Sequence, residues 1–497
     1  MNTMSDDTRN SVNEAAVMQS ISQNSELRDY YFSHTPPISF QDVIDKYPNS
    51  QDPNMQILRD YVANNPGSGS YEIRDYHNFG DGKGYSVLVS AGDDVYVGFD
   101  GTGRNGWIDN GEGLCEVRTE LQQQACNQFD YYATSPEFAD IMNTDHNIVV
   151  TGHSKGGNKA MYVTMNSEYG YLINSCVSMD GQGFSPEAIE YWNKVYGENG
   201  YSERAGKIIS ISGQNDFVHE LGISIVKPQN QYIVDYQERN LLGKKPSEVL
   251  DILFSFHKNN DMFSQTWNWR TMRFEYTSNL NRESSPGIIE PILNEFMAQY
   301  MRLGQNERKE SALAVMTFFQ KAFGGKADSL TKDDIDGIVA ALLQTSLGLE
   351  LVGSLATIIA AISPLMAVQV CAYFMSILER IKKNKREQYA EDIVSSIASH
   401  EILFNTESFV DMRSSFDETF DYAIVGAVYA KKAEIIKYDS SVCEALVNTV
   451  NKKSEDMKDI MRIIVDSFTA TDSANARAAR TIGESYLGSE IYAMVQS

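Results

Sequence analysis

Short runs of β-branched and aromatic residues in the middle of the chain predict a sheet. The runs at 85–89 and 95–99 are separated by the turn sequence Ala-Gly-Asp-Asp at 91–94, which is typical of a β-hairpin. Three further runs predict buried strands, and two helical patterns lie among them; the strands are at 147–151, 175–179 and 207–211, and the helices at 116–142 and 158–166. Strands that alternate with helices are typical of a mostly parallel sheet covered by helices, so the pattern predicts an α/β fold.

The pattern on either side of this segment predicts how the chain is divided. Up to about residue 76, short amphipathic patterns between prolines indicate helices and loops. A polar, turn-rich stretch at 279–287 ends the strand signals, and helical periodicity dominates after it. We therefore predict an α/β domain over 1–280, with a helical lead-in over 1–80, and an all-helical domain over 288–497.

One uncharged run in the predicted helical domain has two interpretations. Residues 351–378 are long enough to span a bilayer as a single helix, and a basic cluster at 380–386 follows them directly. Pro364 would break or kink that helix, and small polar residues soften its hydrophobicity, which favours two packed helices instead. The sequence leaves a buried helical hairpin and a membrane contact both open.

Composition changes this picture by excluding some functions. The chain has 67 acidic and 42 basic side chains, a formal net charge of −25, which argues against binding to nucleic acid through phosphate contacts. The five cysteines are scattered, with no pair at the spacing of a zinc site or of a disulfide framework; they are Cys115, Cys126, Cys176, Cys371 and Cys443. The negative charge should also slow approach to anionic membranes at low salt.

A serine nucleophile is predicted at a strand-to-helix turn. The sequence Gly-His-Ser-Lys-Gly at 152–156 lies between the predicted strand at 147–151 and the predicted helix at 158–166. In that context it is typical of a nucleophile elbow, because the small residues permit the strained turn that lifts the hydroxyl of Ser154 above the sheet. The alternative is a glycine-rich turn in which this serine caps the helix.

Such a serine needs a histidine base and a carboxylate that orients the imidazole. In the predicted α/β domain the histidines after the elbow are His219 and His257. We favour His257, because His219 follows the favoured acid, Asp216, by only three residues. Asp180, at the end of the preceding predicted strand, is the rival acid, and either aspartate could instead be a loop carboxylate that caps a helix.

Two backbone amides are expected to stabilise the tetrahedral oxyanion. One belongs to Lys155, the residue after the nucleophile. The other is assigned to Thr102, together with its hydroxyl, in the glycine-rich turn that follows the second strand of the predicted hairpin. We expect neither a cofactor nor a metal ion in this chemistry.

These motifs carry a resemblance to a known family. The Gly-Thr turn at 101–102, the elbow and the sequence Asp-Gly-Gln-Gly-Phe at 180–184 are together similar to the Mbeg1-like group, relatives of the class 3 lipases. The resemblance covers roughly 85–267. Those families have an arginine where this chain has Asp100, so a salt bridge made by that arginine is not expected here.

The resemblance implies an α/β-hydrolase fold and a function. It implies a carboxylic ester hydrolase that acts on acyl lipids, as a lipase or a phospholipase, with Ser154, Asp216 and His257 as its triad. The competing hypothesis is a catalytically degenerate hydrolase fold that serves as a scaffold, with the helical half binding other helical proteins or a membrane.

The C-terminal half resembles a second group. The sequences at 468–472 and 486–490 are similar to the aromatic-x-x-x-acid element of type VII secretion substrates, and the first thirty residues do not form a Sec-type signal peptide. The chain thus resembles secreted lipase effectors, or toxins, that carry an LXG-like helical targeting domain. That resemblance implies WXG100-like helical partner proteins and an immunity protein. Alternatively, the C-terminal half is a helical lid or an oligomerisation domain, and the protein is cytoplasmic.

Overall fold

The computed structural model describes residues 4–80, 83–103, 106–235, 256–258, 262–286, 290–324, 341–342, 345–347 and 351. The chain divides into two compact units. The first comprises Met1–Glu238, Leu253–Glu290 and Gly304–Ile338, and the second comprises Arg239–Ile252, Pro291–Leu303 and Val339–Ser497. Helix α10 (Glu290–Tyr300) lies largely in the second unit, and every other element below belongs to the first.

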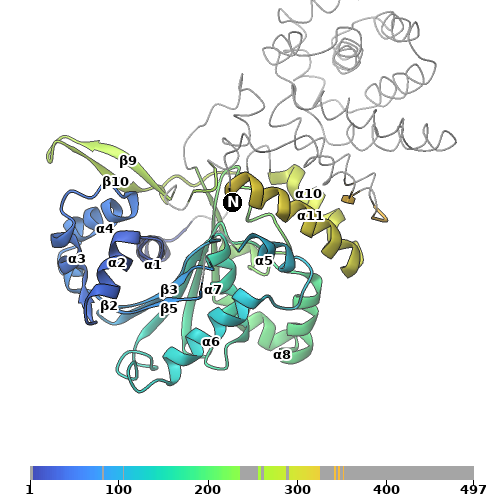
Figure 1. Cartoon of the computed structure of the whole chain (residues 1–497), viewed down its shortest axis with the longest axis horizontal. Helices are drawn as coiled ribbons and strands as arrows, with labels where there is room; N and C mark the ends of the chain where they lie inside the picture. Colours follow the sequence, from blue (N-terminus) through green and yellow to red (C-terminus); the bar gives the residue numbers. More distant parts are fainter. Residues whose placement is uncertain are drawn as a thin grey trace, which may run out of the picture. The chain divides into compact units, whose positions relative to one another are not determined.

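An eight-stranded sheet forms the centre of the first unit (Figure 1). Its strands lie in sequence order, antiparallel from β1 to β4 and parallel from β4 to β8. They are β1 (Ile38–Ser39), β2 (Glu72–Asn78), β3 (Tyr85–Ala91), β4 (Asp94–Phe99), β5 (Asn147–His153), β6 (Ile173–Met179), β7 (Ile208–Gly213) and β8 (Gln231–Val234). The predicted α/β class, the mostly parallel sheet and the hairpin of β3 and β4 are confirmed.

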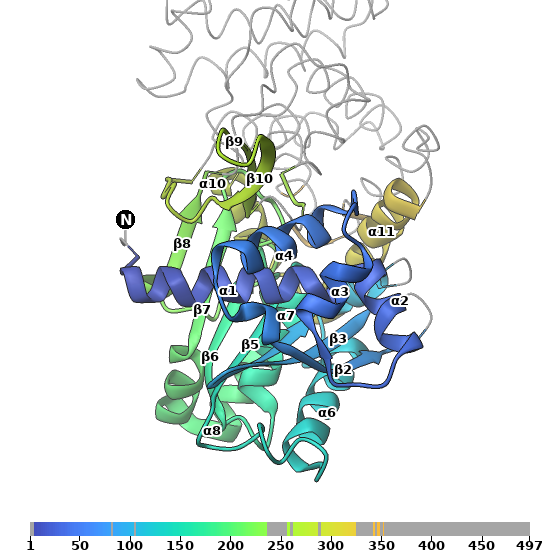
Figure 2. The ribbon, with the colours of Figure 1, turned by 90° about the vertical axis from the view of Figure 1, so that its left-hand side faces the viewer.

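Helices cover both faces of this sheet (Figures 1 and 2). One layer consists of α1 (Asp6–Ser22), α2 (Ser25–Ser33), α3 (Phe40–Lys46) and α4 (Pro53–Asn64). The other consists of α6 (Glu120–Thr134), α7 (Lys155–Asn166) and α8 (Pro186–Gly206). Helix α1 crosses β3 to β6 on one face, and α7 packs against β4, β5 and β6 on the other.

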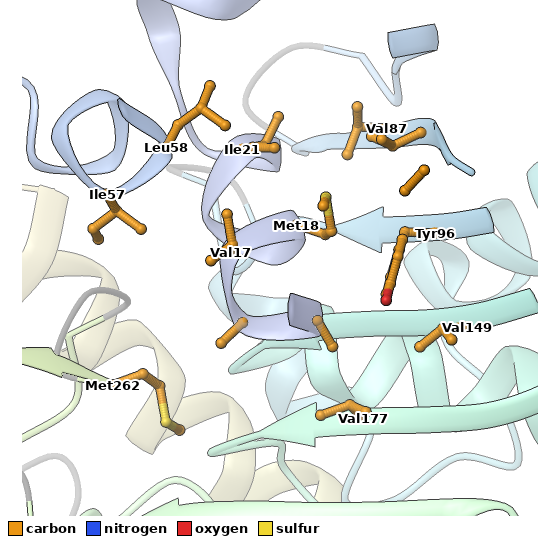
Figure 3. Close-up of a cluster of buried hydrophobic side chains, with 14 of the residues drawn as sticks. Val17, Met18, Ile21, Ile57, Leu58, Val87, Tyr96, Val149, Val177 and Met262 are labelled. Atoms are coloured by element: carbon orange, nitrogen blue, oxygen red, sulfur yellow. The ribbon is translucent and has the colours of Figure 1, made fainter. Parts of the chain in front are cut away.

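Two hydrophobic cores result, because successive side chains of a strand point to opposite faces. In β5, Val149 packs into the core beneath α1, whereas Ile148 and Val150 belong to the core beneath α6 and α7. Figure 3 shows the first core, in which Val17 and Met18 of α1 lie over the side chains of the central strands. Strands that are buried on both faces have continuous apolar sequences, which explains why the sequence predicted β5.

Helix α11 (Gln305–Gly324) packs against α5 (Trp107–Glu112). A Cβ on Gly111 would lie 2.8 Å from the Cγ of Met316, so this glycine permits the close approach of the two helices. The Nζ of Lys309 also lies 2.7 Å from Glu116 Oε1. Helix α11 thus belongs to the first unit although it lies beyond residue 288. The domain bounds of the sequence analysis stay a prediction.

Some strands were not predicted, for identifiable reasons. In β2 only Ile73 and Tyr76 are buried, and a register shift between Ile73 and Asp75 interrupts the alternation that marks a strand. The short strand β8 and a separate two-stranded hairpin, β9 (Phe263–Asn268) and β10 (Arg273–Ser278), were also missed. The hairpin carries exposed aromatic residues and therefore lacks a clear polar face.

Several predictions fall on residues that the structure does not describe. They concern the all-helical character of most of 288–497, the run at 351–378, and the sequences at 468–472 and 486–490. Secretion by a type VII-like route, helical partners and an immunity protein stay predictions. Within the described ranges, none of the helices combines the length and apolar character needed to cross a membrane. Cys115, Cys126 and Cys176 are buried free thiols.

Candidate active site

Ser154 occupies a strained turn between β5 and α7. Its backbone has φ 58° and ψ −124°, a conformation that residues with a side chain seldom adopt. The amide of Ser154 donates a hydrogen bond of 2.8 Å to the carbonyl of Met179, at the end of β6. The strain is held by the surrounding sheet, as expected for an elbow that presents a nucleophile.

The glycines of the elbow are required by close backbone contacts. A Cβ on Gly152 would lie 2.3 Å from the carbonyl carbon of Gly156, and a Cβ on Gly156 would lie 2.1 Å from the carbonyl oxygen of Phe99. Lys155 is the first residue of α7, so its N–H has no acceptor within the helix. This amide and the positive end of the helix dipole are therefore available to an anion beside Ser154.

The structure brings Ser154, His257 and Asp216 together. The Nε2 atom of His257 lies 2.7 Å from the Oγ of Ser154, and its Nδ1 lies 2.5 Å from Oδ2 of Asp216. Because an ionised carboxylate can only accept, Nδ1 carries the proton and Nε2 accepts from the serine hydroxyl. This arrangement can remove a proton from Ser154 and return it to a leaving group.

Asp216 is buried and also contacts His219. Its second oxygen, Oδ1, accepts from the amides of Val218 at 2.7 Å and His219 at 3.2 Å. The same oxygen lies 3.4 Å from Nδ1 of His219, whose Nε2 lies 3.2 Å from Glu220. Although His219 follows Asp216 by only three residues, its ring thus contacts the Asp216 carboxylate. His257 faces the other oxygen of that carboxylate, Oδ2.

Charges in the site shift three pKa values. Burial raises the pKa of Asp216, but the neighbouring His257 and His219 outweigh it and leave the pKa far below its ordinary value. Burial lowers the pKa of His257, and the carboxylate of Asp216 outweighs that effect, so the pKa is raised. The pKa of His219 is likewise raised, against the effect of burial, by Asp216 and Glu220. The two histidines thus share one carboxylate.

Asp180, the rival acid, lies against a different histidine. Its Oδ2 is 3.6 Å from Nε2 of His153, too far for a hydrogen bond, and its Oδ1 accepts from the amide of Gly213 at 2.7 Å. The His153 ring stacks on the His257 ring, with centroids 4.7 Å apart. Burial lowers the pKa of His153, which favours a neutral ring that supports the imidazole of His257 by packing.

The turn that carries Thr102 passes the nucleophile at Gly101. A Cβ on the preceding residue, Gly101, would be 3.7 Å from the Cβ of Ser154. The hydroxyl oxygen of Thr102 accepts a hydrogen bond of 3.0 Å from Nδ2 of Asn110 in α5. That contact leaves the hydroxyl hydrogen for a second partner.

Two buried lysines of α7 hold both ends of this turn; the sequence analysis gave a role only to the backbone amide of one of them, Lys155. Nζ of Lys155 lies 2.5 Å from Oδ2 of Asp109, and Nζ of Lys159 lies 3.0 Å from the carbonyl oxygen and 3.4 Å from Oδ1 of Asp100. Residues four apart share one face of a helix, so one helix can hold the two ends of the segment at 100–109. Asp100, which stands where the related families have arginine, therefore has a salt-bridge partner.

Burial affects the two ion pairs differently. It raises the pKa of Asp109, but Lys155 outweighs this effect and the net pKa is lowered. The pKa of Asp100 is raised to about 6, chiefly by burial, and burial also lowers the pKa of Lys159. The Asp109 pair is therefore the more strongly ionic of the two.

Some of these groups also lie close enough to share a metal ion. They form two sets in which the possible ligand atoms lie within 4.8 Å of one another: His153, Asp180 and His257, and Asp180, Asp216 and His219. Both ring nitrogens of His257 already contact Asp216 and Ser154. A metal ion on His257 would displace one of these contacts, and both oxygens of Asp216 also have partners, so we assign a metal to neither set.

Comparison with known proteins supports the family resemblance over part of the chain. No match was found among curated proteins or among solved structures. A family model matches residues 91–249. This segment contains β4 to β8, the elbow and Asp216, while His257 lies just beyond it. Residues 91–249 are similar to the Mbeg1-like family, whose model they match.

Proposed function

We propose that the protein is a serine carboxylester hydrolase. The observation that carries this proposal is the continuous hydrogen-bonded chain from Asp216 through His257 to Ser154, which ends at a serine in a strained elbow. Each of the three groups has the hydrogen-bonded partner that acyl transfer requires.

In the proposed reaction, Nε2 of His257 takes the proton of the Ser154 hydroxyl as Oγ attacks the ester carbonyl. The oxyanion of the tetrahedral intermediate accepts hydrogen bonds from the amides of Lys155 and Thr102 and from the hydroxyl of Thr102. His257 then donates the proton to the departing alcohol, which leaves an acyl group on Ser154. Water, activated by the same imidazole, hydrolyses this acyl ester.

Acyl lipids are the proposed substrate class, which makes the enzyme a lipase or a phospholipase. The similarity of residues 91–249 to the Mbeg1-like family supports this choice, since the motifs of that group resemble those of the class 3 lipases.

The proposal is tested with an ester substrate and a serine-reactive probe. Ser154→Ala should abolish hydrolysis of a long-chain ester and labelling by a fluorophosphonate, because no nucleophile remains. Ser70→Ala is the matched control: its hydroxyl is exposed and bonds the carbonyl of Gly67, so both signals should persist. Unchanged turnover in Ser154→Ala would refute the proposal, and a wild-type protein that resists the probe would favour the scaffold hypothesis.

A further inference from the structure

The hairpin of β9 and β10 exposes an unusual number of large apolar side chains. The exposed fractions are 78% for Trp269, 64% for Met272, 61% for Phe274 and 38% for Trp267. All four lie within eight consecutive positions. Since contiguous exposed apolar groups usually mark an interaction site, this group, the aromatic tip, requires a partner.

The aromatic tip is an ordered cluster. Trp267 and Phe274 are directly opposite each other in the antiparallel register, with ring centroids 5.0 Å apart. The ring of Trp269 lies 5.9 Å from that of Trp267, and both contacts are edge-to-face. The three rings therefore share one side of the hairpin.

The hairpin is fixed to the first unit by polar contacts. Nη2 of Arg273 lies 2.9 Å from Oδ1 of Asp60 in α4, whose Oδ2 accepts from the amide of Tyr276 at 2.8 Å. At the base of the hairpin the buried Met262 accepts from the amide of Asn279 at 2.8 Å. Figure 1 shows the hairpin extending outward past α4. The aromatic tip is thus held away from the sheet by rigid contacts.

A second polar cluster holds the carboxylate of the hairpin, which shares Arg273 with Asp60. Glu275 accepts from Asn268 at 2.6 Å, from Thr271 at 2.6 Å and from Arg273 at 3.2 Å. Arg270, in the turn between the strands, is exposed beside Trp269. In a chain of net charge −25, this turn therefore presents a cation next to tryptophan, methionine and phenylalanine.

We propose that the aromatic tip docks the protein on an anionic lipid bilayer. Tryptophan is favoured at the boundary between head groups and acyl chains, where its ring is apolar and its N–H stays wet. An arginine at the same level is attracted to anionic head groups. The choice of a lipid surface rests on the proposed function. The aromatic tip gives an acidic protein a local means of approaching a membrane.

The test measures binding to vesicles of phosphatidylcholine with and without phosphatidylglycerol. Full-length protein carrying Ser154→Ala is used, so that the vesicles stay intact. Adding Trp269→Ser and Phe274→Ser should lower the partition coefficient roughly tenfold or more, because two large side chains no longer leave water. Arg270→Glu should weaken binding to the anionic vesicles more than to the neutral ones.

Matched controls separate docking from general surface hydrophobicity. Phe32 and Tyr171 are exposed by 57% and 66%, and changing both to serine should leave the partition coefficient unchanged. Bromine-labelled lipids should quench the tryptophan fluorescence of the parent protein, and this quenching should be lost when Trp267 and Trp269 are both phenylalanine. Thermal unfolding confirms that each variant is folded.

The proposal is overturned if the parent protein does not bind vesicles, or if the tip and control variants bind equally well. Binding that survives loss of the tip would place the lipid contact on another surface of the protein. Because the measurement needs no turnover, it distinguishes a failure of docking from a failure of the proposed hydrolase activity.

Discussion

The Nε2 atom of His257 lies 2.7 Å from the Oγ of Ser154, although 103 positions separate the two residues in the chain. The short contact places the imidazole where it can act as a base without rearrangement of the backbone. The strained elbow supplies one partner and the loop before β9 supplies the other.

Asp216→Asn should reduce kcat roughly 10⁴-fold, as loss of the orienting carboxylate does in serine proteases. The amide of asparagine can donate to Nδ1 and would then favour the wrong tautomer of His257. Asp180→Asn is the comparison, since Oδ2 of Asp180 lies 3.6 Å from Nε2 of His153, the ring that stacks on His257. Its effect should be milder, and an equal loss in both variants would count against Asp216 as the sole acid.

The pH dependence of kcat/KM should reflect the raised pKa of His257. The base must be neutral, so activity should fall as pH decreases through a pKa above the ordinary value of about 6.5. Asp216 and Asp180 raise this pKa, while burial and His219 oppose them. The acidic limb measured with a soluble ester should therefore lie above pH 6.5 in the wild type. A limb below that value would contradict the assignment of His257.

Thr102→Val should lower kcat about 10²-fold with a smaller effect on KM, which is the cost of losing one oxyanion donor. The hydroxyl of Thr102 accepts from Asn110, which leaves its hydrogen directed elsewhere. Thr102→Ser retains the hydroxyl and should stay close to the wild type. If valine and serine behave alike, the hydroxyl has no role and the backbone amide is the donor.

The Lys159 and Asp100 pair should show strong coupling in urea unfolding. Asp100→Asn leaves the buried ammonium of Lys159 without its carboxylate and should cost about 3–5 kcal/mol. Replacing both residues, as Asp100→Leu with Lys159→Met, removes the buried charges together and should cost clearly less. If the losses in Asp100→Leu alone and Lys159→Met alone add up to the loss in the double variant, the pair does not act as a unit.

The sequence by itself determined the elements whose signals are local. Strand β5 is apolar on both faces, and the elbow glycines have backbone contacts that exclude any Cβ, so both features appear as short patterns. The order of serine, acid and histidine narrowed the candidates for the site to a few residues. It favoured Asp216 but kept Asp180 as a rival, because both follow predicted strands of the same sheet.

The tertiary structure decided which of these residues meet. Asp216 faces His257 through one oxygen and His219 through the other, while Asp180 turns toward His153. The buried lysines of α7 resembled ordinary surface lysines in the sequence, and nothing there indicated that α11 covers α5. These contacts join residues far apart in the chain, and their geometry depends on how the helices pack on the sheet. A pattern read along one segment contains no information about that packing.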